Sequence, residues 1–332
     1  MQKPLVLKII ERIADEIGAK LSVEPNSMEA IQIIFKNGRR TFVNIRSFNI
    51  NKSSSSKMAE DKDYSSFFLK QFGYNVPVGK AFLSESLCKH MGNERDMISG
   101  YDYAINLGFP IILKPNNLSR GEMVTKVYSK REYFSTAKKI FAKSQVMLVQ
   151  KFYSGRDYRI VVLEGKVISA YQRIPLRIKG DGKLSIRELL DEKQKQFFDL
   201  NRKIYIDLED VRIINKLKRQ RLSFDSVPEK GQTIYLMDIA NLSAGGESVD
   251  VTEDIHPDFC NLAVKVTKDM DLKLCGVDII TDDITKPING QNYIILEINS
   301  APGLSNYALM GEQQMKIVEE LYRKILICLE NS

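Results

Sequence analysis

The chain has 332 residues, of which 43% are hydrophobic, and its Lys and Arg residues outnumber Asp and Glu by 49 to 42. That length supports a sizeable core in two or three lobes. No apolar run approaches the roughly 18 residues that span a bilayer, and the charged start is unlike a signal peptide, so no membrane insertion is expected. The four cysteines form no Cys-x-x-Cys pair, which argues against zinc or disulfides and predicts a cytoplasmic setting.

The first elements predict a small leading unit. Apolar residues at helical spacing indicate a helix over residues 5–18. Two alternating runs, 31–35 and 40–45, flank Asn37-Gly38, which is a strong hairpin signal. The polar, serine-rich run 51–57 that follows is interpreted as a linker.

The middle of the chain alternates strands with helices. The apolar run 110–115 predicts a strand that stops at its proline, and a polar loop follows over 116–121. Ser129 and Glu132 have the spacing of a capping box at the start of a helix. Residues 146–150 then predict another strand.

The last part of the chain predicts a hairpin and further helices. Alternating runs at 158–163 and 166–173 meet at a Glu-Gly turn, and a second capping box starts at Ser185. Helical stripes recur over about 257–271 and 311–330. The mixture of helices, hairpins and mostly antiparallel strands indicates an α+β fold with more than one lobe.

Oxygen ligands for a metal ion are expected near the end of the sequence. Residues 293–299 predict a buried strand, whose period of two puts Glu297 and Asn299 on one face and Leu296 on the other. Asp278 lies on an expected neighbouring strand. Two carboxylates and an amide suit Mg²⁺, often beside nucleotide phosphates. A purely structural pair of acids is the alternative, provided that hydrogen bonds compensate its burial.

Two lysines and a small-residue loop are further candidates for binding anions. Lys114 ends an apolar strand and Lys62 begins a helix, so each is placed to neutralise a phosphate, although a lone lysine is more often solvated. The loop over 241–249 contains adjacent glycines that let the backbone approach an anion; an ordinary turn is the alternative. No Walker A motif is present, and neither histidine lies beside a Ser or Cys nucleophile, so P-loop chemistry and nucleophilic hydrolysis are not expected.

A basic run, Arg212 to Arg221, leaves two interpretations open. It is either a solvated helix face or a dock for an acidic peptide or another polyanion. Binding of nucleic acid is not expected, because no aromatic-rich strand motif accompanies the cations.

Several short motifs occur in order over residues 57–325. They are Gly155-Arg-Asp-Tyr-Arg159, Arg173-Ile-Pro, Gly180-Asp-Gly-Lys-Leu, Ser226-Val-Pro-Glu-Lys-Gly, Ala240-Asn-Leu-Ser-Ala-Gly-Gly, Asp250-Val-Thr, His256-Pro, Gly276-Val-Asp and Glu297-Ile-Asn-Ser-Ala-Pro-Gly. In this order they resemble the ATP-grasp superfamily, and most closely the cyanophycin synthetase-like ATP-grasp module. Glutathione-forming and D-alanine:D-alanine ligases are similar at a greater distance.

The resemblance implies an ATP-grasp fold with two α+β lobes that hold ATP, and domains over 1–56, 57–152 and 153–332. Lys62 and Lys114 would hold the ATP phosphates, and the 116–124 loop would close over them. The remaining implied contacts are Arg120 and Gly121 at the nucleotide phosphates; Gln150, Lys151, Phe152, Asp157 and Leu296 around adenine and ribose; Asp278, Glu297 and Asn299 at Mg²⁺ or Mn²⁺; and Arg159, Arg173, Asn241, Ser243, Gly245, Gly246 and Ser300 at the acyl phosphate and the substrates.

Three features depart from the family pattern. The phosphate-covering loop has only Gly121 where relatives often carry more glycine, which implies slower or substrate-coupled closure. Gln150 stands where many relatives have Glu, which alters the expected contact with adenine. The chain ends at Ser332 without the Mur-ligase-like half of cyanophycin synthetase, so a single-module ligase is expected.

The implied activity is that of an ATP-dependent carboxylate–amine ligase, which joins an amino acid or peptide through an acyl phosphate and releases ADP and phosphate. Modification of a peptide or protein, by macrocyclisation or amino-acid addition, is an alternative substrate class. Two functions of a different kind also stay open, namely phosphoryl transfer without amide formation and a non-catalytic nucleotide-binding regulatory module. The surplus of cations suits acidic amino acids or acidic peptides. A homo-oligomer is left open.

Overall fold

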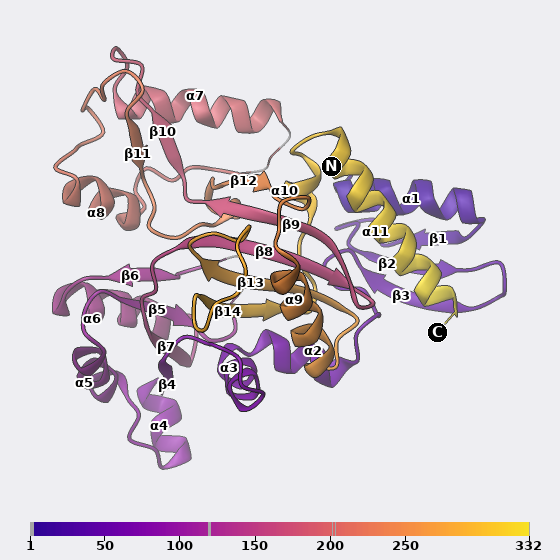
Figure 1. Ribbon diagram of the computed structural model, residues 1–332, viewed down its shortest axis with the longest axis horizontal. Helices are drawn as coiled ribbons and strands as arrows, with labels where there is room; N and C mark the ends of the chain where they lie inside the picture. The colour runs from indigo at the N-terminus through magenta and orange to yellow at the C-terminus, as the bar shows by residue number, and fades with distance from the viewer. Residues whose placement is uncertain (1–2, 119–120, 201, 203, 332) are drawn as a thin grey trace.

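The computed structural model describes residues 3–118, 121–200, 202 and 204–331. The N-terminal unit consists of helix α1 (Leu5–Ile17) and an antiparallel β1-β2-β3 sheet, whose strands are Lys20–Val23, Ala30–Ile34 and Arg40–Asn44. The expected helix and hairpin are therefore confirmed. This unit packs beside the C-terminal helix α11 (Glu312–Asn331), with which it shares a hydrophobic core (Figure 1).

The prediction of a linker over residues 51–57 was wrong. Helix α2 (Ser53–Glu60) begins inside that run, and its Ala59 is buried. Asn51 is also buried, and its amide nitrogen donates to the carbonyl oxygens of Leu274 and Ser300, each at 2.8 Å. Serine is tolerated in a helix, and these tertiary contacts hold the segment in place, so its polar composition was misleading.

The first lobe is built on an antiparallel sheet in the order β4-β7-β5-β6, with strands Gly79–Leu83, Val146–Lys151, Ile111–Pro115 and Thr125–Val127. Helices α5 (Met97–Leu107) and α6 (Lys130–Phe141) supply apolar side chains to the core of this lobe. Helix α4 (Glu85–Met91) follows β4. Helix α3 (Lys62–Gln71) packs instead against β14 (Tyr293–Asn299) of the central sheet and contributes Leu69 to the core of that sheet. The strands predicted at 110–115 and 146–150 are confirmed.

The central sheet has the order β12-β9-β8-β13-β14, with strands Glu247–Asp250, Lys166–Ile174, Arg156–Leu163, Leu274–Thr281 and Tyr293–Asn299. Alternate side chains of β8 enter different cores: Ile160 and Val162 pack with helix α9 (Pro257–Asp269), whereas Val161 and Leu163 pack with α11. The short helix α10 (Ser305–Ala308) follows β14. Burial on both faces explains the long apolar runs of β8 and β13.

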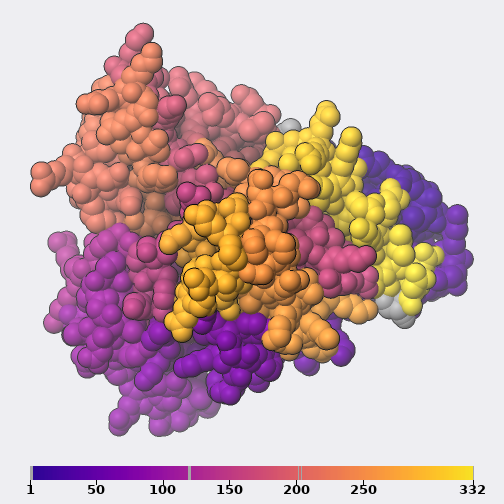
Figure 2. All heavy atoms as spheres, in the orientation of Figure 1, coloured from indigo at the N-terminus to yellow at the C-terminus, as the bar shows by residue number. Residues whose placement is uncertain are grey.

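A separate insert lies between β9 and β12. It contains β10 (Arg177–Lys179), α7 (Ile186–Asp199), α8 (Val211–Arg219) and β11 (Thr233–Tyr235), which surround their own hydrophobic core. The capping box predicted at Ser185 is confirmed, because Ser185 and Glu188 satisfy each other's backbone N–H groups. In Figure 2 the insert lies above the first lobe at the left of the view, and the two are in contact.

All strand pairs recorded for the described residues are antiparallel, and helices pack against the sheets, so the α+β prediction is confirmed. The late helices expected at 257–271 and 311–330 correspond to α9 and α11. Within the described ranges, no helix combines the length and apolar character that crossing a bilayer requires.

Candidate active site

A cavity of about 1350 Å³ is lined by both the first lobe and the central sheet. It collects almost all the residues that the sequence singled out. These are Lys62, Lys114, Gly121, Gln150, Lys151, Phe152, Asp157, Arg159, Arg173, Asn241, Ser243, Asp278, Leu296, Glu297, Asn299 and Ser300. Arg120 lies outside the described residues. Gly245 and Gly246 are buried and are absent from the described lining of the cavity.

The strand that carries Glu297 departs from strict alternation. Asp278 on β13 pairs directly with Glu297 on β14, but the next pair is Ile279 with Ile295. This bulge leaves Leu296 out of the ladder, and both Leu296 and Glu297 line the cavity. The prediction that Leu296 lies on the opposite face was therefore wrong, because the period of two holds only for an uninterrupted strand.

Asp278 is fully buried and is bound by two arginines. Arg159 donates from Nε and Nη2 to the two carboxylate oxygens, at 2.6 and 2.7 Å, and Arg173 Nη2 lies 2.9 Å from Oδ2. Burial alone would raise the pKa of Asp278, but the two guanidinium groups outweigh it and hold the pKa below its ordinary value. Asp278 is therefore an anion with compensated charge.

Asp157 is the second carboxylate of this group. Arg173 donates from Nε to its Oδ1 at 2.7 Å, and Arg173 Nη2 lies 2.6 Å from the same oxygen. Burial raises the pKa of Asp157 to about 6, although Arg173 opposes the shift. Arg173 thus joins Asp157 to Asp278, and the four side chains form a nearly neutral buried cluster with Arg159.

Lys114 also lines the cavity and is almost fully buried. Burial lowers the pKa of its ammonium group to about 8, while Glu297 acts in the opposite direction. Lys62 Nζ lies 4.0 Å from Glu297 Oε2. The solvated-lysine interpretation is therefore wrong for Lys114, and the ammonium groups of Lys62 and Lys114 both interact with the Glu297 carboxylate.

The polar loop after β5 is anchored to the start of α3. Lys62 Nζ donates to the carbonyl oxygens of Leu118 and Asn116, at 2.8 and 3.3 Å, and Asn116 Nδ2 donates to Asp61 Oδ2 at 2.7 Å. Further along the loop, Gly121 has a φ of +62°, and a β-carbon there would lie 2.4 Å from Asn241 Nδ2. Glycine thus permits a close approach between this loop and the segment that contains Asn241.

Gln150 and Phe152 lie at the first-lobe end of the cavity. Gln150 is buried and pairs with Ile112 across the sheet. Lys126 pairs with the same Ile112 from the other side, and its Nζ lies 3.4 Å from the centroid of the Phe152 ring. This cation–π contact shields one side of the ring.

The loop over 241–246 begins with a short-range cap. Asn241 Oδ1 accepts from the backbone N–H of Ser243 at 2.8 Å, and residues Leu242–Ala244 form a 3₁₀ turn. A β-carbon on Gly246 would lie 2.7 Å from the carbonyl oxygens of Asn241 and Ile174. The glycines therefore serve close packing behind the loop, while Asn241 and Ser243 line the cavity.

The donor set fits a magnesium ion in its chemistry. Glu297 and Asn299 lie two residues apart beside Asp278, and Asn299 Nδ2 is buried without a hydrogen-bond partner in the part of the chain that the structure describes. In the same described ranges, no group of three His, Cys, Asp or Glu residues is placed to hold a metal, so a site at Asp278 and Glu297 would need the Asn299 amide oxygen as a further ligand. A purely structural role can explain the burial of Asp278, because two arginines neutralise its charge. It explains Glu297 less well, because the ion-pair partner of Glu297 among the described residues is Lys62 at 4.0 Å.

Sequence reasoning missed Arg202 and Asp238, which also line the cavity. Arg202 Nη2 donates to the carbonyl oxygens of Gly246 and Leu242, at 2.9 and 3.3 Å, and so supports the loop over 241–246 from the insert. No local motif marks Arg202. Asp238 stands three residues before Asn241, and only its tertiary contacts distinguish it from other surface acids.

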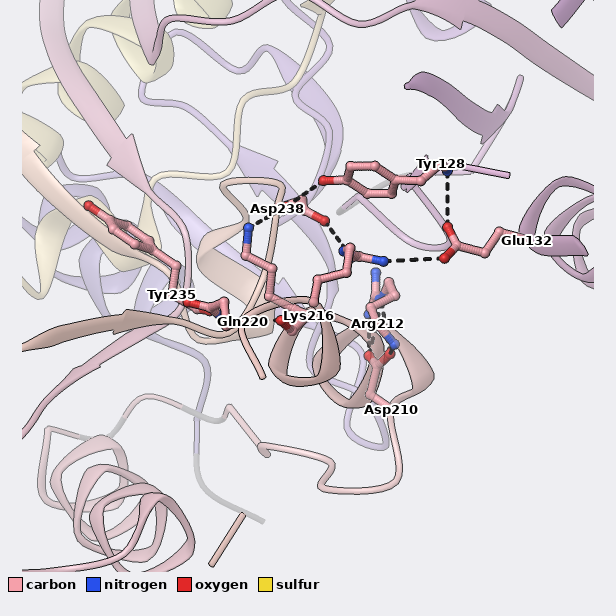
Figure 3. Close-up of polar contacts among 9 residues, drawn as sticks. Tyr128, Glu132, Asp210, Arg212, Lys216, Gln220, Tyr235 and Asp238 are labelled. Atoms are coloured by element: carbon pink, nitrogen blue, oxygen red, sulfur yellow. Dashed lines mark hydrogen bonds and ion pairs between the residues drawn. The ribbon is translucent and has the colours of Figure 1, made fainter. Parts of the chain in front are cut away.

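Three cations of the basic run, Arg212, Lys216 and Arg219, are paired with carboxylates of the same chain. For these three side chains, neither a solvated helix face nor a dock for a polyanion describes what is observed. Lys216 Nζ lies 2.6 Å from Asp238 Oδ1 (Figure 3). Arg219 Nη2 lies 3.0 Å from Asp238 Oδ2. Arg212 Nη2 pairs with Asp210 Oδ2 at 2.6 Å. Composition could not reveal the shared partner, because Asp238 follows the basic run only after β11.

Comparisons with known proteins concern the family and the fold of the chain. A family model described as the RimK-like ATP-grasp domain matches residues 49–183 and 239–323. The chain is 31% identical over 253 residues to cyanophycin synthetase of Crocosphaera subtropica, a match that covers 74% of this chain and 28% of that protein. It is 30% identical over 253 residues to the glutathione biosynthesis bifunctional protein GshAB of Clostridium perfringens, covering 74% of this chain and 31% of that protein.

The fold is also similar to that of a solved structure. A bifunctional glutathione synthetase from Pasteurella multocida superposes with a TM-score of 0.62 at 22% identity, over 97% of this chain and 44% of that one. This likeness concerns the fold alone. The chain thus spans less than a third of the two curated relatives and less than half of the solved one.

Proposed function

The chain belongs to the RimK-like ATP-grasp family, and on that premise we propose that it is an ATP-dependent ligase that joins a carboxylate to an amine. The observation that carries the proposal is the shared cavity. It brings Lys114 of the first lobe and Lys62 of α3 together with the acids and arginines of the central sheet. Such a site meets the needs of phosphoryl transfer, in which positioned charges matter more than acid–base groups.

The nucleotide would lie between the two lobes. Its base would contact Gln150, Lys151, Phe152 and Leu296, and its phosphates would lie at Lys62 and Lys114 under the 116–124 loop. Asp157 is proposed for the ribose, although its present partner is Arg173. Asp278, Glu297 and Asn299 would hold magnesium or manganese, which supplies positive charge that offsets the phosphate oxygens.

In the first step, an oxygen of the substrate carboxylate attacks the γ-phosphorus of ATP. The bond from that phosphorus to the β–γ bridging oxygen breaks, and ADP leaves with the electron pair. Lys62 and Lys114 hold the phosphates in line, and burial of Lys114 excludes competing water. The product is an acyl phosphate.

In the second step, the amine nitrogen attacks the acyl carbon. The carbon–oxygen bond to phosphate breaks, inorganic phosphate leaves, and the nitrogen loses a proton to give an amide. Arg159 and Arg173 are proposed to face the acyl phosphate, and Asn241, Ser243 and Ser300 to orient the substrates. Gly245 and Gly246 shape the loop from behind rather than touching them.

The length of the cavity favours a peptide over a free amino acid as one substrate. Its lining continues past Ser300 to Leu5, Arg46 and Phe48 of the N-terminal unit. At about 1350 Å³ it exceeds the usual size of a small-ligand pocket, about 300–1,000 Å³. Addition of an amino acid to a peptide, or closure of a peptide on itself, would use this extra length.

Four finer points are part of the proposal. An acidic substrate has less support than the composition suggested, because Arg159, Arg173, Lys216 and Arg219 already face carboxylates. A cytoplasmic location rests on the cysteine pattern of the sequence. The division into 1–56, 57–152 and 153–332 rests on the resemblance. No contact observed within the chain addresses a homo-oligomer.

The decisive experiment is incubation of the protein with ATP, Mg²⁺ and pooled amino acids and peptides, followed by mass spectrometry. We expect a product lighter than its two substrates by one water, with one ADP and one phosphate per bond. Hydroxylamine should trap the acyl phosphate and replace the amide product. ATP binding with no ADP release in any pool would favour a regulatory module, and ADP release without a trapped hydroxamate would favour phosphoryl transfer to another group.

A further inference from the structure

The insert contacts the first lobe through the carboxylate of Asp238. Tyr128 Oη of the first lobe donates to Asp238 Oδ1 at 3.2 Å, and the same oxygen lies 2.6 Å from Lys216 Nζ (Figure 3). Arg219 Nη2 donates to Oδ2 at 3.0 Å. Only 12% of the Asp238 side chain is exposed, so water competes weakly for these bonds. One carboxylate therefore joins the two parts of the molecule.

Arg219 makes a second connection between the same parts. Its Nη1 lies 3.3 Å from Glu132 Oε1 in the first turn of α6, and its guanidinium carbon lies 4.1 Å from the centroid of the Tyr128 ring. Glu132 also accepts from the backbone N–H of Tyr128, at 3.0 Å. Tyr128 and Glu132 thus present one preformed surface, to which Arg219 and Asp238 bind together.

The contact lies close in sequence to two loops of the proposed site. Tyr128 directly follows β6, the strand to which the phosphate-covering loop leads. Asp238 directly precedes residues 239–246, which we call the acceptor-side loop, and stands three residues before Asn241 of that loop. These two loops also meet each other, where Gly121 approaches Asn241. The family match omits residues 184–238, so Lys216, Arg219 and Asp238 belong to a segment that the matched family regions do not include.

We propose that Asp238 is a positioning residue for ligation, which couples the placement of the Asn241–Ser243 segment to that of residues 121–128. With Tyr128 and Arg219 it holds the insert against the first lobe, so that ordering of one segment by nucleotide is transmitted to the other. This inference rests on the proposed function, because it concerns a site that binds ATP.

A local ion pair offers a matched control. Arg212 and Asp210 lie at the start of the same helix α8 and pair with each other at 2.6 Å, and among the ion pairs of the described residues Arg212 has none with the first lobe. Arg212→Gln therefore removes a cation from the insert but not from its contact with the first lobe. Tyr128→Phe removes a single oxygen from the first lobe and leaves the insert's own pairs intact.

The test is hydrogen exchange of the full chain with and without a non-hydrolysable ATP analogue and Mg²⁺. In the parent, the analogue should slow exchange of residues 121–128 and 239–246 together. In Asp238→Asn and in Tyr128→Phe, this slowing should shrink roughly tenfold in both segments, the factor that corresponds to loss of one charge-assisted hydrogen bond. In the double variant that combines Asp238→Asn with Tyr128→Phe, the slowing of exchange should shrink no further than in either single variant, because both changes affect the same hydrogen bond. Arg212→Gln should resemble the parent.

Kinetics separates positioning from general stability. Both variants should raise the Michaelis constant for the amine substrate and lower kcat, while exchange within α7 and the unfolding midpoint stay close to the parent values. If both segments keep the full analogue-induced slowing in Asp238→Asn and Tyr128→Phe, the inference is overturned and ATP binding still stands. A parent that binds no analogue would instead overturn the proposed function and, with it, the inference.

Discussion

Arg159 holds Asp278 through two parallel hydrogen bonds, which join Nε to Oδ1 at 2.6 Å and Nη2 to Oδ2 at 2.7 Å. The two residues are direct partners across β8 and β13. Gly276 lies beside this pair, and a β-carbon there would be 3.6 Å from Arg159 Cδ and 2.9 Å from Pro302 Cβ. The carboxylate proposed as a metal ligand is therefore also the counter-ion of a buried guanidinium group.

Asp278→Asn should destabilise the fold as well as abolish turnover. The change removes the negative charge that Arg159 and Arg173 share in the buried cluster. Removing one partner of a buried ion pair lowers the free energy of unfolding by about 3–5 kcal/mol. The free energy of unfolding in urea is the measurement. Asp271→Asn, which removes the exposed partner of Lys52, is the control and should change it little. Equal stability of both variants would contradict the importance of the buried pair.

Glu297→Gln should act on turnover with little effect on the fold. Glu297 is partly exposed to the cavity and has only the distant Lys62 as an ion-pair partner among the described residues, so its loss leaves no buried charge behind. We expect ADP production to fall by about 100-fold or more, because a ligand charge is lost at the proposed metal site. Glu60→Gln changes another acid of the same cavity and should keep near-parent activity. Near-normal turnover of a folded Glu297→Gln protein would remove this side chain from the mechanism.

Lys114 should contribute to both ATP affinity and chemistry. Lys114→Ala removes the ammonium group, and Lys114→Arg replaces a compact charge by a larger planar fork in a buried site, so neither should restore parent behaviour. Isothermal titration with ATP is the measurement, and Lys80→Ala on strand β4 of the same sheet is the control. Parent-like affinity in both Lys114 variants would refute the assignment.

The same residue predicts a pH dependence. Because burial lowers the pKa of Lys114 to about 8, the free protein carries this positive charge below that pH and loses it above. If the ammonium form binds ATP, kcat/KM for ATP should fall above pH 8, by about tenfold for each further unit. In Lys114→Arg this break should disappear, since a guanidinium group does not titrate there. A parent profile that is flat from pH 7 to beyond 9 would contradict the prediction.

Asn51→Leu should destabilise the fold and disturb the turn after β14. The Asn51 side chain donates to the carbonyl oxygens of Leu274 and Ser300 and accepts from the backbone N–H groups of Lys273 and Leu274. Its loss leaves buried backbone groups without hydrogen-bond partners, and each such group lowers the free energy of unfolding by about 1–3 kcal/mol. Urea unfolding measures the change, and Ser54→Ala on the exposed side of α2 is the matched control. If Asn51→Leu is as stable as Ser54→Ala, the contact is dispensable.

Local patterns predicted well which residues line the cavity, because that information lies within a few residues. The spacing of Glu297 and Asn299, the strand end at Lys114 and the adjacent glycines after Asn241 each depend on a short stretch of backbone. The cavity then brings these stretches together, and its lining matches the set that the ordered motifs implied apart from Gly245, Gly246 and the undescribed Arg120.

Three features could be decided only by the tertiary structure. Asn51 lies 223 residues from Leu274 in the sequence, and Arg219 lies 87 residues from Glu132, so no local pattern connects these partners. The bulge at Leu296 depends on pairing with β13. The sequence by itself determined the elements, the acid cluster and the family likeness, because periodicity and turn chemistry are local. Which polar side chains are neutralised, buried or left to face the cavity was decided by contacts between distant segments, since each such energy depends on a partner that folding brings near.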